Sequence, residues 1–372
     1  MQKNGTFRLL FLAVSIAMAG AALSAPPPIK RGPLIGGPRA KTEQAKPAAA
    51  KPKAAAKPIA EKPKTKTAAK PAKPRYVAEK PKATEKPARP SLAPRAPYRG
   101  AIAVDADTGR VLFADNERTA AYPASITKLM TFLLVLEDIK AGAYKLGDRV
   151  EASALAASME PSSVGLRAGQ SMTVHDLLLS IMVKSANDAA EALAEHSASK
   201  TSKSGKADPD ELRAAFVERM NRKAQALGMR DTRYASPNGL PPPRGSKRGF
   251  DVSTAADLVK LGQAVARNPK ALEYTSRPQC KVTDGSGKPL TLVNHNYFIP
   301  GNPDPKHLCA PVEGCDGLKT GFTAASGSSI MLTARRNGRR VIAVVLGSAG
   351  RHEREKAAES ILRDALGAIS VW

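Results

Sequence analysis

The chain has 372 residues and a formal net charge of +25 at pH 7. Residues 26–98 contribute 19 Lys and Arg against 4 Glu, a net +15, so most of the basicity belongs to one stretch of the chain. This distribution excludes a single uniform globule and separates a basic tail from the rest.

The first 25 residues are typical of a signal peptide. Lys3 and Arg8 precede an apolar run over 9–23, which is short for a transmembrane helix. Cleavage is expected after residue 22, 24 or 25, and a retained membrane anchor is the alternative. We therefore expect an exported protein of the periplasm or cell envelope.

Residues 26–97 form a low-complexity stretch of Lys, Pro and Ala, in which Tyr76 is the only aromatic residue. Such a stretch cannot offset its chain entropy by burial, so we expect a disordered linker. Its positive charge favours binding to an anionic envelope polymer or a membrane surface. The alternative is a solvated spacer between the membrane or wall and the rest of the chain. Nucleic acid is not an expected partner, because the protein is expected to be exported.

Residues 98–372 are long enough for one α/β domain with a large core. Two short segments, 101–104 and 110–113, joined by Asp107-Thr108-Gly109, predict an N-terminal hairpin. Helical patterns follow from 123 to about 270, and strands return before a last helix over 353–368. Strands at both ends with helices between them predict one antiparallel sheet assembled from distant parts of the sequence.

The first of three short motifs is Ser-Ile-Thr-Lys, residues 125–128. Pro123 suits the first turn of a helix, and no Pro or Gly follows before Gly142, so an apolar helix is predicted over 123–140. Three residues are close to one helical turn, which places Ser125 and Lys128 on the same face. A lysine buried there could act as a general base toward the serine. The alternative is a capping serine and a solvated lysine.

The second motif is Ser185-Ala186-Asn187. Thr173 and Asp176 predict the capped start of a helix that ends at this motif, and a further helix is expected near 188–196. The motif would lie in the turn between the two helices, with its serine placed to relay a proton. An ordinary polar turn is the alternative.

The third motif is Lys319-Thr320-Gly321. It precedes two apolar runs separated by Asn337-Gly338, a strong hairpin signal, so the motif is predicted on a strand beside that hairpin. A strand there could pair with an extended peptide, and its lysine and threonine could bind a carboxylate. An ordinary strand end is the alternative.

Taken together and in this order, the motifs resemble those of the low-molecular-weight penicillin-binding proteins, the D-alanyl-D-alanine carboxypeptidases. The resemblance runs from about residue 98 to 372, and the segments 236–240 (Ser-Pro-Asn-Gly-Leu) and 252–258 (Val-Ser-Thr-Ala-Ala-Asp-Leu) share it. It implies a penicillin-binding, β-lactamase-like α/β fold. In that fold helices flank an antiparallel sheet and form a helical subdomain.

The resemblance implies that Ser125 is the nucleophile and Lys128 its base, with Ser185 and Lys319 as a proton-relay pair. Asn187 would orient the substrate. The other implied substrate contacts are Thr320 and Arg354 at the terminal carboxylate, the close approach of Gly321, and the backbone N–H groups of Ser125 and Phe322 as the oxyanion hole. For Arg354 the alternative is an exposed charge at a helix start.

The implied reaction removes the terminal D-Ala from peptidoglycan stem pentapeptides through an acyl-enzyme, without metal or cofactor, and β-lactams would be covalent inhibitors. A D,D-endopeptidase that cuts crosslinks stays open, because no segment resembling the second, all-β domain of well-known members follows Gly321. Phe322 also stands where some members have His.

Two further alternatives are less favoured. A class A β-lactamase would carry Asp at the position of Ala186, and Glu160 is only a loosely placed candidate for its deacylating glutamate. A catalytically inactive wall-binding protein would not explain why all three motifs are intact.

The three cysteines, Cys280, Cys309 and Cys315, precede the third motif. An exported protein meets an oxidising compartment, and Cys309–Cys315 would close a small loop, but Cys280 is another possible partner and the pairing is open. A zinc site from His295, His307 and two cysteines is disfavoured, because the spacing fits no standard pattern.

Overall fold

The structure, a computed structural model, describes residues 95–201, 207–306 and 308–370. All described residues belong to one compact unit. The predicted signal peptide, and the predicted linker apart from 95–97, lie outside the described residues. Within the described ranges no helix has the length and apolar character needed to cross a membrane.

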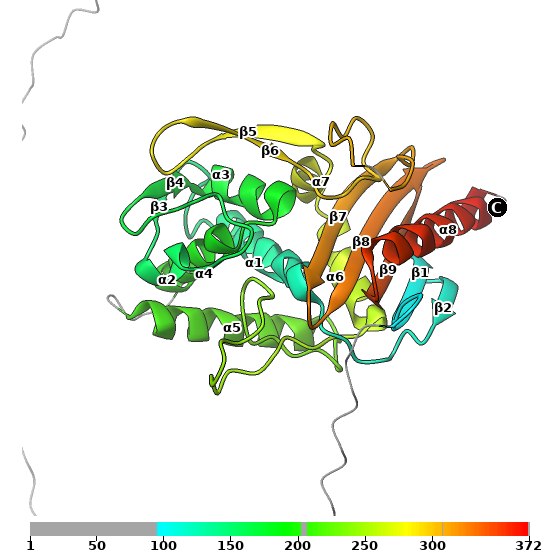
Figure 1. Cartoon of the computed structure of the whole chain (residues 1–372), viewed down its shortest axis with the longest axis horizontal. Coiled ribbons are helices and arrows are strands. Elements are labelled where there is room, and N and C mark those ends of the chain that lie inside the picture. The colour runs from blue at the N-terminus through cyan, green and yellow to red at the C-terminus, as the bar shows by residue number, and fades with distance from the viewer. Residues whose placement is uncertain (1–94, 202–206, 307, 371–372) are drawn as a thin grey trace, which may run out of the picture. The chain divides into compact units, whose positions relative to one another are not determined.

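A five-stranded antiparallel sheet with the strand order β2-β1-β9-β8-β7 organises the domain (Figure 1). Its strands are β1 (Gly100–Asp105), β2 (Val111–Asp115), β7 (Cys315–Thr323), β8 (Gly327–Arg336) and β9 (Arg339–Ser348). Ile102 of β1 lies opposite Val344 of β9, so the two ends of the domain meet at the centre of the sheet. The predicted antiparallel sheet from distant sequence is confirmed.

The turn between β8 and β9 contains the predicted Asn-Gly pair. Asn337 and Gly338 have φ angles of 50° and 79°, values that suit the tight turns joining twisted antiparallel strands. The turn thereby sets the register that places Met331 of β8 beside Val344 of β9.

Each face of the sheet is covered by a helix. α8 (Arg351–Ser370) packs on one face and α6 (Ala255–Ala266) on the other (Figure 1). Alternate residues of β9 enter the two cores, with Ala343 on the α8 side and Val344 on the other side. This alternation follows from the two-residue period of a strand, and burial on both faces explains the continuous apolar runs at 330–332 of β8 and 341–346 of β9.

The remaining helices form the helical part of the domain between β2 and β5. They are α1 (Lys128–Lys140), α2 (Ala154–Ala157), α3 (Val174–Leu179), α4 (Asn187–Thr201), α5 (Pro209–Ala226) and α7 (Pro269–Thr275). Two small antiparallel pairs accompany them, β3 (Arg149–Glu151) with β4 (Ser171–Thr173), and β5 (Gln279–Thr283) with β6 (Pro289–Val293).

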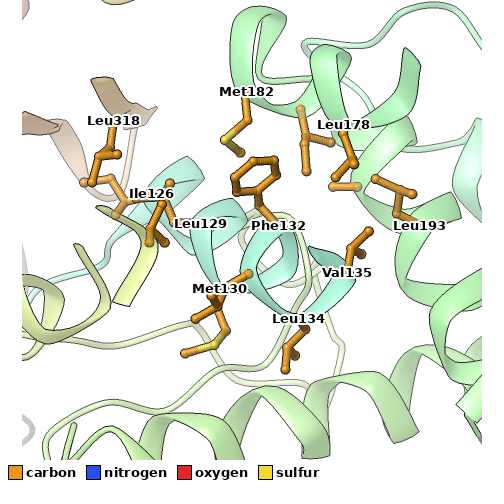
Figure 2. Packing of buried hydrophobic residues seen from close by; sticks show 14 of the residues in the cluster. Ile126, Leu129, Met130, Phe132, Leu134, Val135, Leu178, Met182, Leu193 and Leu318 are labelled. Atoms are coloured by element: carbon orange, nitrogen blue, oxygen red, sulfur yellow. The ribbon is translucent and has the colours of Figure 1, made fainter. Parts of the chain in front are cut away.

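Helix α1 is the centre of this part, and every residue from Lys128 to Leu136 is buried. Figure 2 shows Phe132 of α1 among Leu178, Met182 and Leu193 of the surrounding helices. Full burial of each such side chain stabilises the fold by about 2 kcal/mol. A helix that is apolar all round is expected only in a core, so α1 gives the site at its start a rigid support.

Candidate active site

Ser125 lies in a 3-10 turn, η1 (Ala124–Thr127), that leads directly into α1. The predicted helix is confirmed, although its first turn is tighter than an α-helical turn. Ala124 has a φ of 49°, a conformation that non-glycine residues rarely adopt and that concentrates at functional sites. The half-buried Ser125 side chain is thus held at a locally strained turn on a rigid helix.

Two glycines allow other segments to approach this turn closely. A Cβ at Gly239 would lie 2.0 Å from the Ala124 carbonyl oxygen, and a Cβ at Gly321 would lie 2.7 Å from the Pro123 carbonyl oxygen. Side chains at either position would force the backbones apart. The segment 236–240 and the third motif can therefore approach the first motif this closely only because these two positions carry no side chain.

The Lys128 ammonium lies against Ser125, as the three-residue spacing predicts. Its Nζ donates to Ser125 Oγ at 2.9 Å, to Asn187 Oδ1 at 2.6 Å and to the Asn238 carbonyl oxygen at 2.6 Å. Burial holds the pKa of Lys128 well below its usual range, and the nearby charge of Lys319 lowers that pKa further. The carboxylates of Asp251, Asp188 and Glu191 act in the opposite direction. A lysine of this kind can accept a proton near neutral pH.

The second motif lies at an irregular helix junction. α3 starts at the predicted Thr173 cap, whose Oγ1 accepts from Asp176 N–H at 3.0 Å, and continues as a π-helical turn, η2 (Ser180–Lys184). Ser185 then adopts a left-handed conformation with a φ of 62°, and α4 begins at Asn187. Such single π turns are frequent at functional sites. The Ser185 side chain is buried, and the structure records no hydrogen bond from it to Lys319 among the described residues.

Asn187 is fixed from two sides. Its Oδ1 accepts from Lys128, and its Nδ2 donates to the Pro161 carbonyl oxygen. The neighbouring Asp188 accepts from the N–H groups of Val164 and Leu166. Residues 161–166 are thereby anchored to the start of α4, next to the motif.

The third motif lies on β7, at the edge of the sheet, and β7 packs against η1. Lys319 is buried, and its Nζ donates to the Thr320 carbonyl oxygen at 3.0 Å. Burial lowers the pKa of Lys319 to about 7, and the charge of Arg354 lowers it as well. Phe322, directly after the motif, is 65% exposed, so an apolar ring faces solvent at this end of β7.

Arg354, near the start of α8, is 4% exposed rather than an exposed helix-start charge. Its guanidinium is paired with Glu355 and donates to the Ser329 carbonyl oxygen at 3.5 Å. Its charge acts on Lys319, so the structure brings this cation close to the third motif.

Sequence reasoning assigned no role to two residues that hold the site together. The Asn238 carbonyl receives the Lys128 ammonium, and the Asp251 carboxylate accepts from Thr127 Oγ1 at 2.8 Å and from Ser236 Oγ at 2.9 Å. Both lie more than 100 residues after the serine, and no local spacing relates them to it. The segment 236–240, noted only as part of the resemblance, was the available signal.

Metal and disulfide chemistry receive no support from the described residues. Cys280, Cys309 and Cys315 are all free thiols, and burial raises the pKa of Cys309 and of Cys315 to about 12. No group of three or more His, Cys, Asp or Glu side chains that could hold a metal occurs in the described part, and His307 lies outside it. Glu160 is exposed and accepts from Ser163 Oγ at 2.6 Å, rather than from a group at the site.

The geometry agrees with comparisons to known proteins. A family model described as D-alanyl-D-alanine carboxypeptidase, peptidase family S11, matches residues 89–350. The chain belongs to this family. The resemblance predicted from the motifs is therefore confirmed, and so is the penicillin-binding, β-lactamase-like fold.

Individual relatives define the extent of the likeness. The D-alanyl-D-alanine carboxypeptidase DacF of Bacillus subtilis is 32% identical over 264 residues, which are 71% of this chain and 61% of DacF. A D-alanyl-D-alanine endopeptidase of Pseudomonas aeruginosa is 32% identical over 256 residues, 68% of this chain and 72% of that protein. The ampicillin-bound penicillin-binding protein D2 of Listeria monocytogenes has a TM-score of 0.58 at 28% identity, covering 72% of this chain and 97% of its own. The chain thus spans about three fifths of the length of DacF.

Proposed function

We propose that the chain is a serine D-alanyl-D-alanine carboxypeptidase that removes the terminal D-Ala from peptidoglycan stem pentapeptides. The observation that carries the proposal is the 2.9 Å contact between Lys128 Nζ and Ser125 Oγ, made by a buried lysine whose pKa lies well below its usual range. A serine hydroxyl needs a neighbouring base before it can attack a carbonyl near neutral pH, and this lysine supplies one.

In the proposed reaction, neutral Lys128 takes the proton from Ser125 as Oγ bonds to the carbonyl carbon of the penultimate D-Ala. The negative charge on the carbonyl oxygen is stabilised by the backbone N–H groups of Ser125 and Phe322. The C–N bond then breaks, and D-Ala leaves after its amine receives a proton through Ser185 and Lys319. Water hydrolyses the acyl-enzyme and restores the serine.

Substrate binding is proposed to use the edge strand β7. An extended peptide would pair with β7 near Gly321, and Asn187 would bind a substrate backbone amide. The terminal carboxylate would meet the Thr320 hydroxyl and the cations of Lys319 and Arg354. β-Lactams carry a comparable carboxylate beside a reactive carbonyl, so we propose that they acylate Ser125.

The domain plan and location belong to the same proposal: a signal peptide over 1–25, a linker over 26–97 and a catalytic domain over 98–372. Membership of a peptidoglycan enzyme family supports action at the cell wall. Export to the periplasm or cell envelope, and binding of the basic tail to an anionic envelope polymer or membrane surface, are proposed from the sequence.

The test uses the chain from residue 26 onward, a fluorescent penicillin and a pentapeptide ending in D-Ala-D-Ala. We expect covalent labelling and release of D-Ala, both abolished in Ser125→Ala. Ser360→Ala, an exposed serine on α8, is the matched control and should behave as wild type. A folded protein that gives neither signal would refute the assignment.

A crosslink-cutting endopeptidase is the second candidate, favoured by the Pseudomonas aeruginosa relative that bears that name. The same residues would act on a D-Ala amide bond to a second stem peptide. Chromatography of digested wall separates the two: loss of crosslinked dimers with intact pentapeptide monomers would select the endopeptidase.

A further inference from the structure

A buried carboxylate lies behind the Lys128 site. Glu191, on α4, is 1% exposed and follows Asn187 by four residues, which places both on the same face of the helix. Its Oε2 accepts from Asn238 Nδ2 at 2.9 Å. Its Oε1 has no hydrogen-bond partner among the described residues and lies 3.7 Å from Arg213 Nε. A buried carboxylate oxygen without a hydrogen bond lowers the stability of the fold, so its presence here requires an explanation.

Asn238 connects this carboxylate to the proposed base. Its backbone carbonyl oxygen accepts from Lys128 Nζ at 2.6 Å, and its Oδ1 accepts from Leu240 N–H at 2.9 Å. Because Oδ1 accepts from Leu240 N–H, the side-chain amide is oriented with Nδ2 toward Glu191. Asn238 therefore links Glu191, through its side chain, to Lys128, through its backbone carbonyl oxygen.

The charges around both groups come from several elements. The groups that act on Glu191 are Arg213 and Asp210 of α5, Arg248 of the following loop and Glu195 of α4. The groups that act on Lys128 are Lys319 of β7, Asp251, Asp188 and Glu191. Burial raises the pKa of Asp188 and of Asp251, although the several hydrogen bonds that each of them accepts act in the opposite direction. Burial likewise raises the pKa of Glu191, to about 7, so its charge changes near neutral pH.

We propose that Glu191 is a positioning residue for Lys128: it holds Asn238 in place, and its negative charge raises the pH at which Lys128 becomes a base. This inference rests on the proposed acyl-transfer function. Glu191 does not touch the reacting atoms, and its effect passes through Asn238 and through the electrostatic field at the ammonium.

The sign of the effect follows from the charges. Ionised Glu191 favours the ammonium form and so raises the pKa of Lys128. Glu191→Gln keeps the shape and an acceptor for Asn238 but removes the charge, and it leaves the cations Arg213 and Arg248 uncompensated. The pKa of Lys128 should therefore fall. The rise of the acylation rate with pH should then occur about 0.5 to 1 unit lower, as expected for the loss of one nearby charge.

The test measures the rate of labelling by a fluorescent penicillin from pH 5 to 10. Glu191→Gln should label faster than wild type below the wild-type midpoint and more slowly above it, because a lysine of lower pKa is a weaker base. Glu195→Gln is the matched control. Glu195 is also a buried glutamate of α4 with a pKa raised to about 7, but it accepts from Ser153 Oγ and does not contact Asn238. Glu195 acts on Glu191 but is not among the charges that act on Lys128, so its variant should shift the profile far less than Glu191→Gln does.

Three outcomes would overturn the inference: an unshifted Glu191→Gln profile, a uniform loss of rate at every pH, or an equal shift in Glu195→Gln. Glu191→Leu serves as a second variant if the amide is poorly tolerated; it removes the acceptor for Asn238 Nδ2 as well as the charge, so a lower rate at every pH is expected beside the shift. It must show the same shift to lower pH. Wild type that is not labelled at all would instead refute the proposed function.

Discussion

Lys128 and Lys319 are buried to the same degree but lie in opposite surroundings. Lys128, on α1, donates to three protein acceptors and lies in the field of three carboxylates. Lys319, on β7, has a hydrogen bond to its neighbour's carbonyl, and the charge that acts on it is the cation Arg354. Within the described residues no carboxylate acts on Lys319 as Asp251 acts on Lys128.

The comparison shows that burial alone does not define what a lysine can do. Two ammonium groups close together in a low dielectric cannot both stay charged at low cost, and burial lowers the pKa of both lysines. The protein groups around Lys128 hold it against Ser125, as the proposed base requires. The surroundings of Lys319 would be completed by an anion, as expected of the proposed carboxylate subsite.

The largest expected effect is on the rate of acylation, and it tests the role of Lys128 as the base. Lys128→Ala removes the proposed base, and acylation by penicillin should fall by about 10³-fold, within the range of general-base contributions. Stopped-flow labelling measures the rate, and Lys281→Ala, an exposed lysine of β5, is the control. A variant within tenfold of wild type would show that another group takes the serine proton.

The second effect concerns stability. The pKa of Lys319 is about 7 when folded and near its usual value of 10.5 when unfolded, so between these values only the unfolded chain binds the proton. Stability should rise with pH across this window, and the full penalty of the buried charge applies below pH 7. Lys319→Met should therefore stabilise the protein by on the order of 4 kcal/mol at pH 6 and by little at pH 10.5.

Urea denaturation at pH 6 and pH 10.5 measures this difference, with Lys281→Met as the exposed control. Equal stabilisation at both pH values would mean that the gain comes from packing. The buried lysine would then carry no charge penalty.

The third effect tests how the two lysines are brought together. A Cβ at Gly321 would lie 2.7 Å from the Pro123 carbonyl oxygen and 3.2 Å from Ser125 N, so Gly321→Ala should push β7 away from η1. Acylation should fall on the order of 50-fold, as expected for a misplacement of about 1 Å. Gly367→Ala, in an open part of α8, is the control and should leave the rate unchanged. An active Gly321→Ala would mean that the close approach is dispensable.

The smallest effect concerns Arg354. The double variant Arg354→Gln/Glu355→Gln removes both charges of a buried pair, so that neither is left alone. KM for the D-Ala-ended peptide should rise about tenfold, with kcat little changed, because the lost cation would bind substrate and transition state alike. Steady-state kinetics measures KM and kcat for both proteins, and an unchanged KM would exclude Arg354 from carboxylate binding.

Much of the fold follows from local signals. The Asn-Gly turn, the helix after Pro123 and the apolar runs of β8 and β9 each predict their own element, and the two-residue period explains both faces of the sheet. The contact of Lys128 with Ser125 also follows from spacing, because three residues span one turn. The π turn at 180–184 and the strained φ of Ala124 have no such signature, since tertiary contacts impose them.

The partners of Lys128 show why the rest of the site was not predictable. The Asn238 carbonyl is a backbone group, so no pattern of side chains in the sequence predicts its contact with Lys128. Glu191 has the appearance of a surface residue, because charged helix positions are usually exposed. The alanines on either side of it, at 189, 190, 192 and 194, were the usable signal, because a helix so rich in small side chains can pack closely on every side.

The position of β9 at the centre of the sheet also governs how the domain can be made. β9 joins β1, whose residues lie more than 200 positions earlier, to β8, so β1 has no strand partner other than β2 until β9 has been synthesised. Contacts between such distant segments form slowly, and the apolar strand β1 is open to wrong pairing in the interval. The two parts of the sheet are therefore joined only after more than 200 residues have been added to β1, and a chain cut short before residue 339 cannot close its sheet at all.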